Sequence, residues 1–381
     1  MHTNSNEMKA QPRSIGYVGQ IPVRNLWLLM LYASDLFREL HTAKIAVEDN
    51  PDQIPDLVAE ILCRRVERRI QRNLSYGYRS HEAEISRVRG RIDLLKTESH
   101  RLMDHGKVAC RFNELTVDTP RNRYVLMALE KLGGLVARRG LKHRCFSLAQ
   151  GMKRLGVVEQ LPNRGEVTVN QFGRHDATDQ SMVAAAHLAF NLALPTEAVG
   201  SSLLSLPERE VTWLRRLYEK GIAGFYDVAL TPLGWCIERG KILQWQISHK
   251  SHGIERILPS MRTDIVLTSP RRDCRFVIDT KFNTLTIQGW HKEETIRSGY
   301  LYQIYAYLKS QDCKSDPLSQ NATGLLLHPS VGEMISEEVV IQDHEIRFKT
   351  VDLSANASEI RSQLLEAIEI KGHQKEYRSK P

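Results

Sequence analysis

The most informative segment of the chain reads Arg262-Thr-Asp-Ile-Val-Leu-Thr-Ser-Pro-Arg-Arg-Asp-Cys-Arg-Phe-Val-Ile-Asp-Thr-Lys281. Two runs rich in β-branched residues flank a Ser-Pro-Arg-Arg-Asp turn, a pattern typical of a β-hairpin. With the turn centred between Arg271 and Arg272, Asp264 in the first strand lies directly opposite Asp279 in the second. The sequence therefore predicts that these two carboxylates are neighbours in one sheet.

Alternation along the predicted strands places three charged side chains on one face of the sheet, those of Asp264, Asp279 and Lys281. Facing residues have Cβ atoms roughly 4.5–5.5 Å apart, and two ionised carboxylates this close repel each other unless a cation lies between them. The apolar residues point to the opposite face, toward a core: Phe276, Ile278 and Phe282. We therefore expect a metal-binding surface on one side of this hairpin.

Hard oxygen ligands suit Mg²⁺ or Mn²⁺ rather than zinc. Magnesium held by carboxylates keeps water molecules and accepts phosphate oxygens. Such a metal would polarise a phosphoryl group and activate bound water, while the Lys281 ammonium would orient that water or offset charge developing on phosphorus. The pattern thus favours hydrolysis of a nucleic-acid backbone.

The Asp-x-Lys pattern is common by chance, so a simpler interpretation is possible. In it, Asp264 and Asp279 are solvated strand residues, and Lys281 is their charge partner. The surroundings of Asp279 argue against it, since Val277 and Ile278 make the strand apolar at that point. A carboxylate without a role is costly in such a strand. The metal-binding interpretation is favoured, and the solvated one stays open.

A tyrosine-rich helix is expected around residues 300–308. Gln303 and Tyr307 are four residues apart and share one helical face, with Tyr300 one turn before them. This face would hold the water network of the metal or a phosphate. Alternatively, the tyrosines belong to an ordinary core helix.

The composition is that of a soluble globular protein with basic character. Hydrophobic residues make up 41% and charged residues 26%, and 53 Lys and Arg against 45 Asp and Glu give a net charge of +8. This charge favours a polyanionic partner such as DNA. The longest apolar run, Leu26–Ala33, is too short to span a bilayer, and residues 1–20 lack the apolar core of a signal peptide. We expect a cytoplasmic protein without membrane contact, whose cysteines are reduced.

Strands mixed with helices indicate an α/β protein, and three parts are expected. Residues 1–20 form a flexible polar leader, residues 21–200 an N-terminal partner-binding region with a small irregular β part, and residues 201–381 the C-terminal domain. The boundary follows Pro195, which is expected to end a helix, because the small and polar residues 196–205 are typical of a linker. Residues 26–32 form a buried strand or the start of a helix, with the helix favoured. Further helices in the N-terminal region are expected over residues 56–74, 124–137 and 181–194.

The helix expected over residues 56–74 is strongly basic, with arginines on the surface left by its apolar stripe: Arg64, Arg65, Arg68, Arg69 and Arg72. Such a helix would bind DNA phosphates without sequence specificity or meet an acidic partner surface. A solvated charged face is the alternative.

The order Asp264, Asp279-Thr280-Lys281 and Gln303-x-x-x-Tyr307 resembles the PD-(D/E)XK nuclease superfamily, in the branch with a trailing Q-x-x-x-Y helix. Further stretches, between about residues 20 and 330, are similar to the McrC family, the nuclease subunits of McrBC modification-dependent restriction systems. They include Ile21–Asn25, Arg89–Ile92, His105–Lys107, Phe112, Asp118–Thr119, Asn122–Arg123, Leu258–Pro259, Thr263–Ile265 and Leu301–Gln303. The acid before the lysine is Asp rather than Glu, a variation that the superfamily tolerates.

The resemblance implies a restriction-endonuclease-like domain with a mixed central sheet flanked by helices, preceded by an α+β region. In that domain Asp264 and Asp279 would bind the metal, Lys281 would assist the attacking water, and Gln303 and Tyr307 would support the site. The resemblance also implies a Mg²⁺-dependent DNA endonuclease subunit of an antiviral defence system. Its partner would be an McrB-like AAA+ ring, a GTPase or an ATPase, that supplies recognition of methylated DNA.

The chain carries no G-x-x-x-x-G-K-[ST] motif, so any nucleotide is expected on the partner rather than on this chain. Glu219, beside an apolar helix stripe, is either the additional acid that some of these nucleases use or a surface glutamate. Two alternatives to the endonuclease stay open: a docking subunit that stimulates the motor without cutting, and an exonuclease that needs free DNA ends.

Overall fold

The computed structural model describes residues 17–18, 20–34, 37, 50–163, 166, 177–198, 208–288, 294–313, 315–331 and 334–369. It separates into two compact units, of which unit 1 contains residues 1–54 and 194–381 and unit 2 contains residues 55–193. Both units mix helices and strands, and unit 1 holds a mixed six-stranded sheet, so the expected α/β class is confirmed. Within the described ranges, every helix is too short or too polar to cross a membrane.

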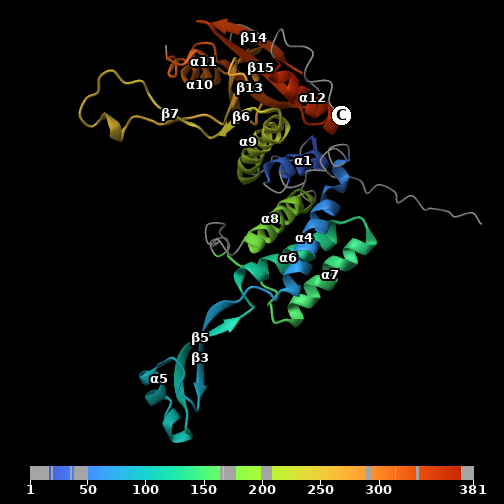
Figure 1. The fold of residues 1–381 in the computed structure, drawn as a ribbon, viewed down its shortest axis with the longest axis vertical. Coiled ribbons are helices and arrows are strands. Elements are labelled where there is room, and N and C mark those ends of the chain that lie inside the picture. Colours follow the sequence, from blue (N-terminus) through green and yellow to red (C-terminus); the bar gives the residue numbers. More distant parts are fainter. Residues whose placement is uncertain are drawn as a thin grey trace, which may run out of the picture. The chain divides into compact units, whose positions relative to one another are not determined.

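Unit 1 is built around the six-stranded sheet, with strand order β14-β15-β13-β10-β9-β6. Strand β13 is parallel to β10 and to β15, and the other neighbours are antiparallel. The strands of unit 1 are β1 (Tyr17–Val18), β2 (Ile21–Pro22), β6 (Cys236–Arg239), β7 (Ile242–Leu243), β8 (Met261–Arg262), β9 (Ile265–Thr268), β10 (Arg275–Thr280), β11 (Thr286–Gln288), β12 (Glu294–Ile296), β13 (Thr323–Ser330), β14 (Ser336–Ile341) and β15 (His344–Asp352) (Figure 1). Its helices are α1 (Val23–Ala33), α9 (Glu208–Leu230), α10 (Ser298–Lys309), α11 (Pro317–Gln320) and α12 (Ala357–Ala367).

The predicted hairpin is present as β9 and β10. Ile278 pairs with Ile265, which is the register expected from a turn centred between Arg271 and Arg272. Ser269 closes the turn, because its backbone N–H donates to the Cys274 carbonyl at 3.1 Å. The register prediction is confirmed.

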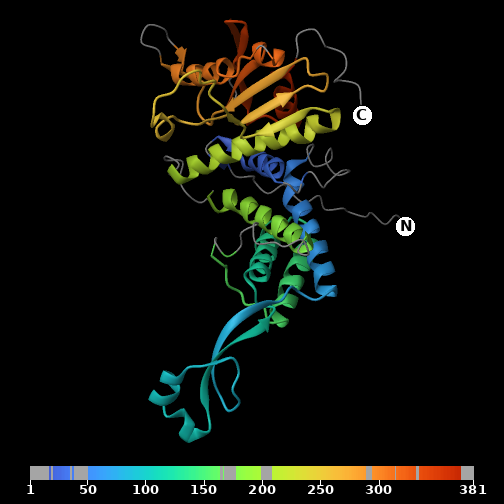
Figure 2. The ribbon, with the colours of Figure 1, turned by 60° about the vertical axis from the view of Figure 1, so that its left-hand side comes forward.

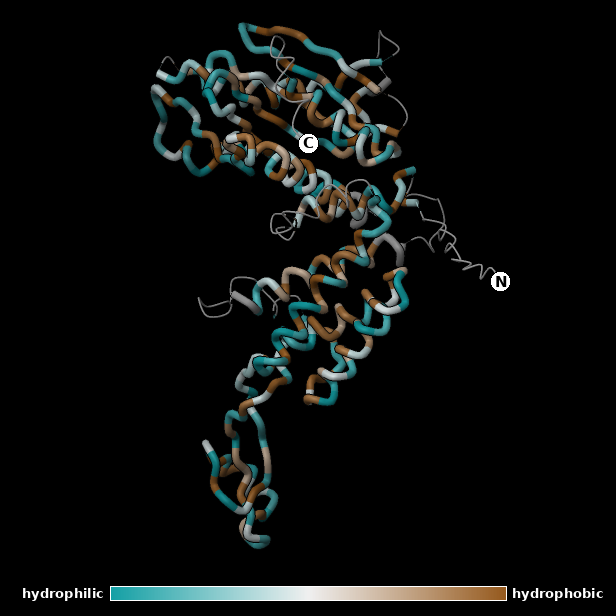
Figure 3. Tube along the Cα trace, turned by 45° about the vertical axis from the view of Figure 1, so that its right-hand side comes forward, coloured by the Kyte–Doolittle hydropathy of each residue, from teal (hydrophilic) through white to brown (hydrophobic). Residues whose placement is uncertain are grey.

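One face of the sheet is covered by α10. Ile304 and Leu308 of this helix share a buried cluster with Val277 and Leu326 of the strands. Gly324 on β13 permits the close approach, because a Cβ atom there would lie 2.9 Å from side-chain atoms of both Ile304 and Leu308. The hydrophobic residues gather along these central strands (Figure 3).

The opposite face carries the predicted apolar residues of β10 and is covered by α9 and α12, with α9 running alongside the sheet (Figure 2). Phe276 is buried, and Phe282 contacts Tyr218 of α9 with ring centroids 5.7 Å apart. Tyr226 of α9 donates its hydroxyl to the Leu364 carbonyl of α12 at 2.8 Å. Each large side chain buried in this way contributes about 1.5–3 kcal/mol.

Helix α1 packs along α9 and is joined to the end of the sheet. Asn25 donates through Nδ2 to the carbonyls of Leu353 and Ala355, at 2.7 and 2.9 Å. The two helices touch backbone to backbone at Gly224, where a Cβ atom would lie 1.8 Å from the Tyr32 carbonyl oxygen. Only a residue without a side chain fits at this point of α9.

The division into units differs from the sequence-based one in two respects. Residues 21–54 lie in unit 1 because of the packing of α1, whereas residues 21–200 were expected to form one region. Helix α8 (Ala177–Ala198) continues through Pro195, which was wrongly expected to end it. In the last turn of a helix, proline removes one backbone hydrogen bond, and α8 tolerates this loss. Residues 199–205 of the expected linker lie outside the described residues.

Unit 2 combines helices with a three-stranded sheet of order β3-β5-β4, where a small β part was expected. Its elements are α4 (Ile54–Gln71), β3 (Gly77–Ile85), β4 (Arg91–Ile92), α5 (Leu94–Ser99), β5 (Val108–Thr116), α6 (Pro120–Leu135), α7 (Arg139–Arg154) and most of α8. Helix α6 begins at Pro120, four residues before the expected start, and the Thr119 hydroxyl caps it by accepting a hydrogen bond from the Asn122 backbone N–H at 3.2 Å.

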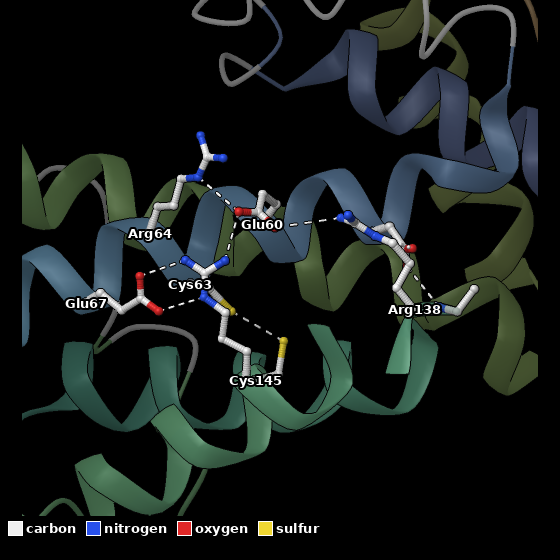
Figure 4. Close-up of polar contacts among 9 residues, drawn as sticks. Glu60, Cys63, Arg64, Glu67, Arg138 and Cys145 are labelled. Carbon is white, nitrogen blue, oxygen red and sulfur yellow. Dashed lines mark hydrogen bonds and ion pairs between the residues drawn. The ribbon is translucent and has the colours of Figure 1, made fainter. Parts of the chain in front are cut away.

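Helices α4 and α7 contact each other through charged side chains and two cysteines, as Figure 4 shows. Arg144 donates to both carboxylate oxygens of Glu67, at 2.6 and 2.7 Å, and to Glu60 at 2.8 Å. These bonds lower the pKa of both glutamates. Beneath them the Sγ atoms of Cys63 and Cys145 lie 3.5 Å apart as free thiols.

Substituting Gly224→Ala tests the contact between α1 and α9. We expect the free energy of unfolding to fall by about 2–3 kcal/mol, because the added methyl group meets a backbone carbonyl that cannot move aside. Thermal unfolding of the full chain measures this. Gly134→Ala in α6 is the matched control, since no atom lies within 4 Å of its Cβ position, and it should leave stability unchanged or raise it by about 0.5–1 kcal/mol. Equal effects of the two substitutions would contradict the packing argument.

Candidate active site

The residues predicted to carry chemistry lie at the same end of the β9–β10 hairpin. Asp264 directly precedes β9, Asp279 is the penultimate residue of β10, and Lys281 directly follows it. Continuing the confirmed register by one step beyond Ile278 and Ile265 places the two aspartates opposite each other. Alternation puts them on the face that α10 covers.

Asp264 is half-buried and fixed by its neighbour across the hairpin. Its Oδ2 accepts hydrogen bonds from the backbone N–H and the hydroxyl of Thr280, at 2.7 and 2.8 Å. Its Oδ1 accepts none from the residues that the structure describes. One oxygen therefore orients the side chain, and the other keeps its lone pairs for a ligand.

Asp279 is almost completely buried, at 1% exposure. Its Oδ2 lies 2.6 Å from Lys281 Nζ. Burial raises the pKa of Asp279 to about 6, with the Lys281 ammonium opposing the shift and the Asp264 and Glu219 carboxylates adding to it. The protein thus holds a desolvated carboxylate next to other carboxylates, an arrangement that a bound cation would stabilise.

Glu219 on α9 also belongs to this neighbourhood. Its side chain is exposed, yet partial burial and the Asp264 carboxylate raise its pKa, while Arg262, Lys220 and Lys281 lower it. Glu219 is therefore a surface residue close enough to Asp264 to feel its charge, and a role as an additional acid of the site stays a prediction. Among the described residues, no three His, Cys, Asp or Glu side chains are close enough together to hold a metal ion jointly.

Gln303 and Tyr307 form the pair that their spacing indicated. Gln303 Nε2 donates to the Tyr307 hydroxyl at 2.6 Å. Burial raises the pKa of Tyr307, the hydrogen bond from Gln303 opposes this shift, and the charges of Asp279 and Asp264 add to it. The ring of Tyr307 is also part of the core beneath α10. The structure therefore brings together all five site residues predicted from the sequence.

Three further residues lie near Lys281, namely Tyr300, Asn283 and His328. The sequence did not predict their positions beside it. Its Nζ lies 5.4 Å from the centre of the Tyr300 ring. The Tyr300 hydroxyl accepts a hydrogen bond from Asn283 Nδ2 at 2.5 Å, and the Asn283 carbonyl is 2.9 Å from His328 Nδ1. Only the parallel pairing of β10 with β13 brings His328 to this position, and no local pattern reveals that pairing.

The residues present fit Mg²⁺ better than a transition metal. Both candidate ligands are carboxylates, and Mg²⁺ is commonly held by one or two protein carboxylates together with water and substrate phosphates. The Oδ1 atom of Asp264 is available, and the negative charge around Asp279 is only partly balanced by Lys281. The donor set therefore suits a divalent cation that completes its shell with solvent and a phosphodiester.

The basic helix of unit 2 is less exposed than its sequence suggests. Arg65 Nη1 donates to the Ser181 carbonyl at 2.6 Å, and Arg69 Nε lies 2.7 Å from Asp179 Oδ1, so both arginines tie α4 to α8. Arg64 pairs with Glu60 on its own helix. The two remaining arginines, Arg68 and Arg72, are exposed. Exposed positive charge on this segment is therefore carried by Arg64, Arg68 and Arg72, and DNA binding by it stays a prediction.

Comparisons with known proteins show what the chain is similar to. The family model described as "McrBC 5-methylcytosine restriction system component" matches residues 2–166. The type IV methyl-directed restriction enzyme EcoKMcrBC of Escherichia coli (strain K12) is 25% identical over 354 residues, 91% of this chain and 97% of that protein. The resemblance to McrBC systems that the motifs indicated is thereby confirmed, with the family model covering residues 2–166 and the Escherichia coli relative covering most of the chain.

Two solved McrBC assemblies from Thermococcus gammatolerans are also similar to the chain. The refined half-complex of the tetradecameric assembly of McrB AAA+ hexamers with bound McrC has a TM-score of 0.41 at 14% identity, covering 91% of this chain and 76% of that one. The cryo-EM structure of the McrBC complex has a TM-score of 0.31 at 13% identity, covering 44% and 50%. The McrBC family match ends before residue 264, so the geometry of the aspartate pair is independent of it.

The raised pKa of Asp279 predicts a pH-dependent effect of Asp279→Asn on stability, measured with a chelator present. The folded protein binds this proton more tightly than the unfolded chain, whose carboxyl has a pKa of 3.8. The contribution of this proton to the free energy of unfolding is fully present below about pH 4 and is lost as the pH rises through about 6. The substituted amide cannot ionise, so the stability of the variant relative to the natural protein should rise by about 1–3 kcal/mol between pH 4 and pH 7. Urea unfolding at several pH values measures this, and a difference independent of pH would contradict it.

Proposed function

We propose that this McrBC-type chain is a Mg²⁺-dependent DNA endonuclease subunit that hydrolyses phosphodiester bonds and activates a partner AAA+ NTPase ring. The observation that carries the proposal is the meeting of Asp264, Asp279 and Lys281 at one end of the hairpin. This arrangement matches the PD-(D/E)XK order of the sequence. Two carboxylates beside an ammonium group suit a metal-assisted attack on phosphorus.

Asp264 and Asp279 would hold the metal. When bound, the divalent ion would supply charge stabilisation for the phosphoryl oxygens and lower the pKa of a water ligand. Thr280 keeps Asp264 in place through two hydrogen bonds to Oδ2. Because β10 is an inner strand of the sheet, the burial and position of Asp279 are set by the core rather than by solvent.

Lys281 is the cationic group of the proposed site. Its ion pair with Asp279 holds the ammonium beside the carboxylates, and its side chain remains 22% exposed. From there its N–H groups can orient a water molecule toward phosphorus and stabilise the negative charge that develops on the phosphate. Gln303 and Tyr307 would hold the surrounding water through their polar groups, which are joined at 2.6 Å.

The proposed partner is an McrB-like AAA+ ring that uses GTP or ATP. Support comes from the family match over residues 2–166, and from the absence of a phosphate-binding G-x-x-x-x-G-K-[ST] sequence in this chain. Unit 2 also exposes large apolar side chains on its small sheet and on α5: Tyr78, Leu94 and Leu95. Exposed apolar side chains of this size are typical of protein-binding surfaces. The proposed substrate is DNA, in line with the net charge of +8 and the family's link to 5-methylcytosine.

Cleavage of closed circular DNA, methylated and unmethylated, tests the proposed activity in the presence of Mg²⁺ and a co-purifying ring NTPase. We expect Asp264→Ala, Asp279→Ala and Lys281→Ala each to slow cleavage by at least about 10²-fold, because each removes charge that acts on the reacting phosphate. A chelator should stop cleavage by the natural protein. Glu337→Gln on the exposed edge strand β14 is the control and should cut at the normal rate.

NTP hydrolysis by the partner, measured in the same reactions, separates loss of chemistry from loss of assembly. The site variants should still stimulate the ring, because the substitutions lie outside unit 2. Normal cleavage by all three variants would contradict the proposal. Stimulation without any nicking by the natural protein, under any metal condition, would leave only a docking role. Cleavage that requires free DNA ends would instead indicate an exonuclease.

A further inference from the structure

A lysine that assists catalysis must be held in place, and Lys281 is poorly restrained by its own chain. Its backbone N–H is fixed by the Leu327 carbonyl at 3.1 Å, but four rotatable bonds separate the backbone from the ammonium. The ion pair with Asp279 fixes one side of the ammonium. A single contact of this kind leaves the group free to swing around the carboxylate, so a second contact is needed to define its position.

We propose that Tyr300 is a positioning residue for the Lys281 ammonium, an inference that rests on the function proposed above. The Tyr300 ring centre lies 5.4 Å from Lys281 Nζ, within the range of about 6 Å over which an aromatic face attracts a cation. The ammonium therefore lies between the Asp279 carboxylate and the Tyr300 ring. Tyr300 is half-buried and lies in the first turn of α10, one turn before the Gln303–Tyr307 pair.

The Tyr300 ring is itself held from two sides. Asn283 donates from Nδ2 to its hydroxyl at 2.5 Å. The ring of His328 lies 5.7 Å from it, and His328 Nδ1 contacts the Asn283 carbonyl at 2.9 Å. His328 is fully buried in β13, the strand parallel to β10. The sheet holds His328 in place, and His328 contacts both Asn283 and the Tyr300 ring. These contacts, with the hydrogen bond from Asn283, position the ring that faces Lys281.

An aromatic ring suits this task better than a second carboxylate would. The ring attracts the ammonium through its negative face without accepting its N–H groups in strong hydrogen bonds. Those donors therefore remain available for water or for a phosphate oxygen. A carboxylate at the same place would add negative charge where Asp264, Asp279 and Glu219 already repel one another.

The role of Tyr300 is tested with three variants of the full chain, assayed with the ring partner, Mg²⁺ and closed circular DNA under single-turnover conditions. Tyr300→Leu removes the ring, and we expect cleavage to slow about 5- to 30-fold while DNA affinity changes little. Tyr300→Phe keeps the ring and should retain most of the rate. Tyr302→Leu is the matched control, since Tyr302 lies on the same helix but is exposed to solvent, and it should cut normally.

Nuclear magnetic resonance of the protein labelled with [ε-¹³C]lysine gives a readout that does not depend on cleavage. The ε-methylene resonance of Lys281, assigned with Lys281→Arg, should be shifted by the aromatic ring in the natural protein and in Tyr300→Phe, and should return to the position of exposed lysines in Tyr300→Leu. Absence of this shift in the natural protein would overturn the inference even if Tyr300→Leu fails to fold. So would a normal cleavage rate of a folded Tyr300→Leu variant. Normal cleavage by Lys281→Ala would overturn the proposed function instead, while a shifted resonance would still place the ring beside the lysine.

Discussion

The pairing of β9 with β10 is the constraint on which the site depends. In the observed register, Asp264 and Asp279 lie at facing positions, and Thr280 can bond the Asp264 carboxylate through both its backbone and its hydroxyl. A slip of one residue would turn every side chain of one strand to the other face, so the aspartates would part and Phe276 would leave the core. The same pairing that buries the apolar residues of the hairpin therefore also sets the distance between the two acids. A change in the strand register would therefore disturb both the apolar core and the geometry of the site.

Much of this site could be predicted from the sequence because its signals are local. The turn chemistry fixed the hairpin register, and the four-residue spacing of Gln303 and Tyr307 identified their common helical face. Lys281 follows Asp279 by two residues, so alternation alone placed both on one side. Each of these predictions needs only geometry within a single element or between two strands joined by a short turn.

The remaining features depend on contacts that local patterns do not encode. His328 reaches the site through the parallel pairing of β13 with β10, whose connection contains α10 and α11 and leaves no register signal in the sequence. Helix α1 joins unit 1 because Gly224 on α9 allows backbone contact with Tyr32, almost 200 positions away in the chain. Pro195 does not end α8, because a proline in the last turn costs the helix only one backbone hydrogen bond. The McrBC family model matches residues 2–166 and does not reach Asp264 or Asp279, so it gives no support of its own to the nuclease site.

The central claim is that Asp264 and Asp279 bind one divalent cation together. Anomalous diffraction from crystals of the full chain grown with Mn²⁺ tests this most directly, because Mn²⁺ shares the oxygen ligands of Mg²⁺ and can be located by its own signal. The account predicts a single peak within bonding distance of both carboxylates, and loss of that peak in Asp279→Asn. A peak held by other residues, or density showing the two aspartates directed away from each other, would contradict it.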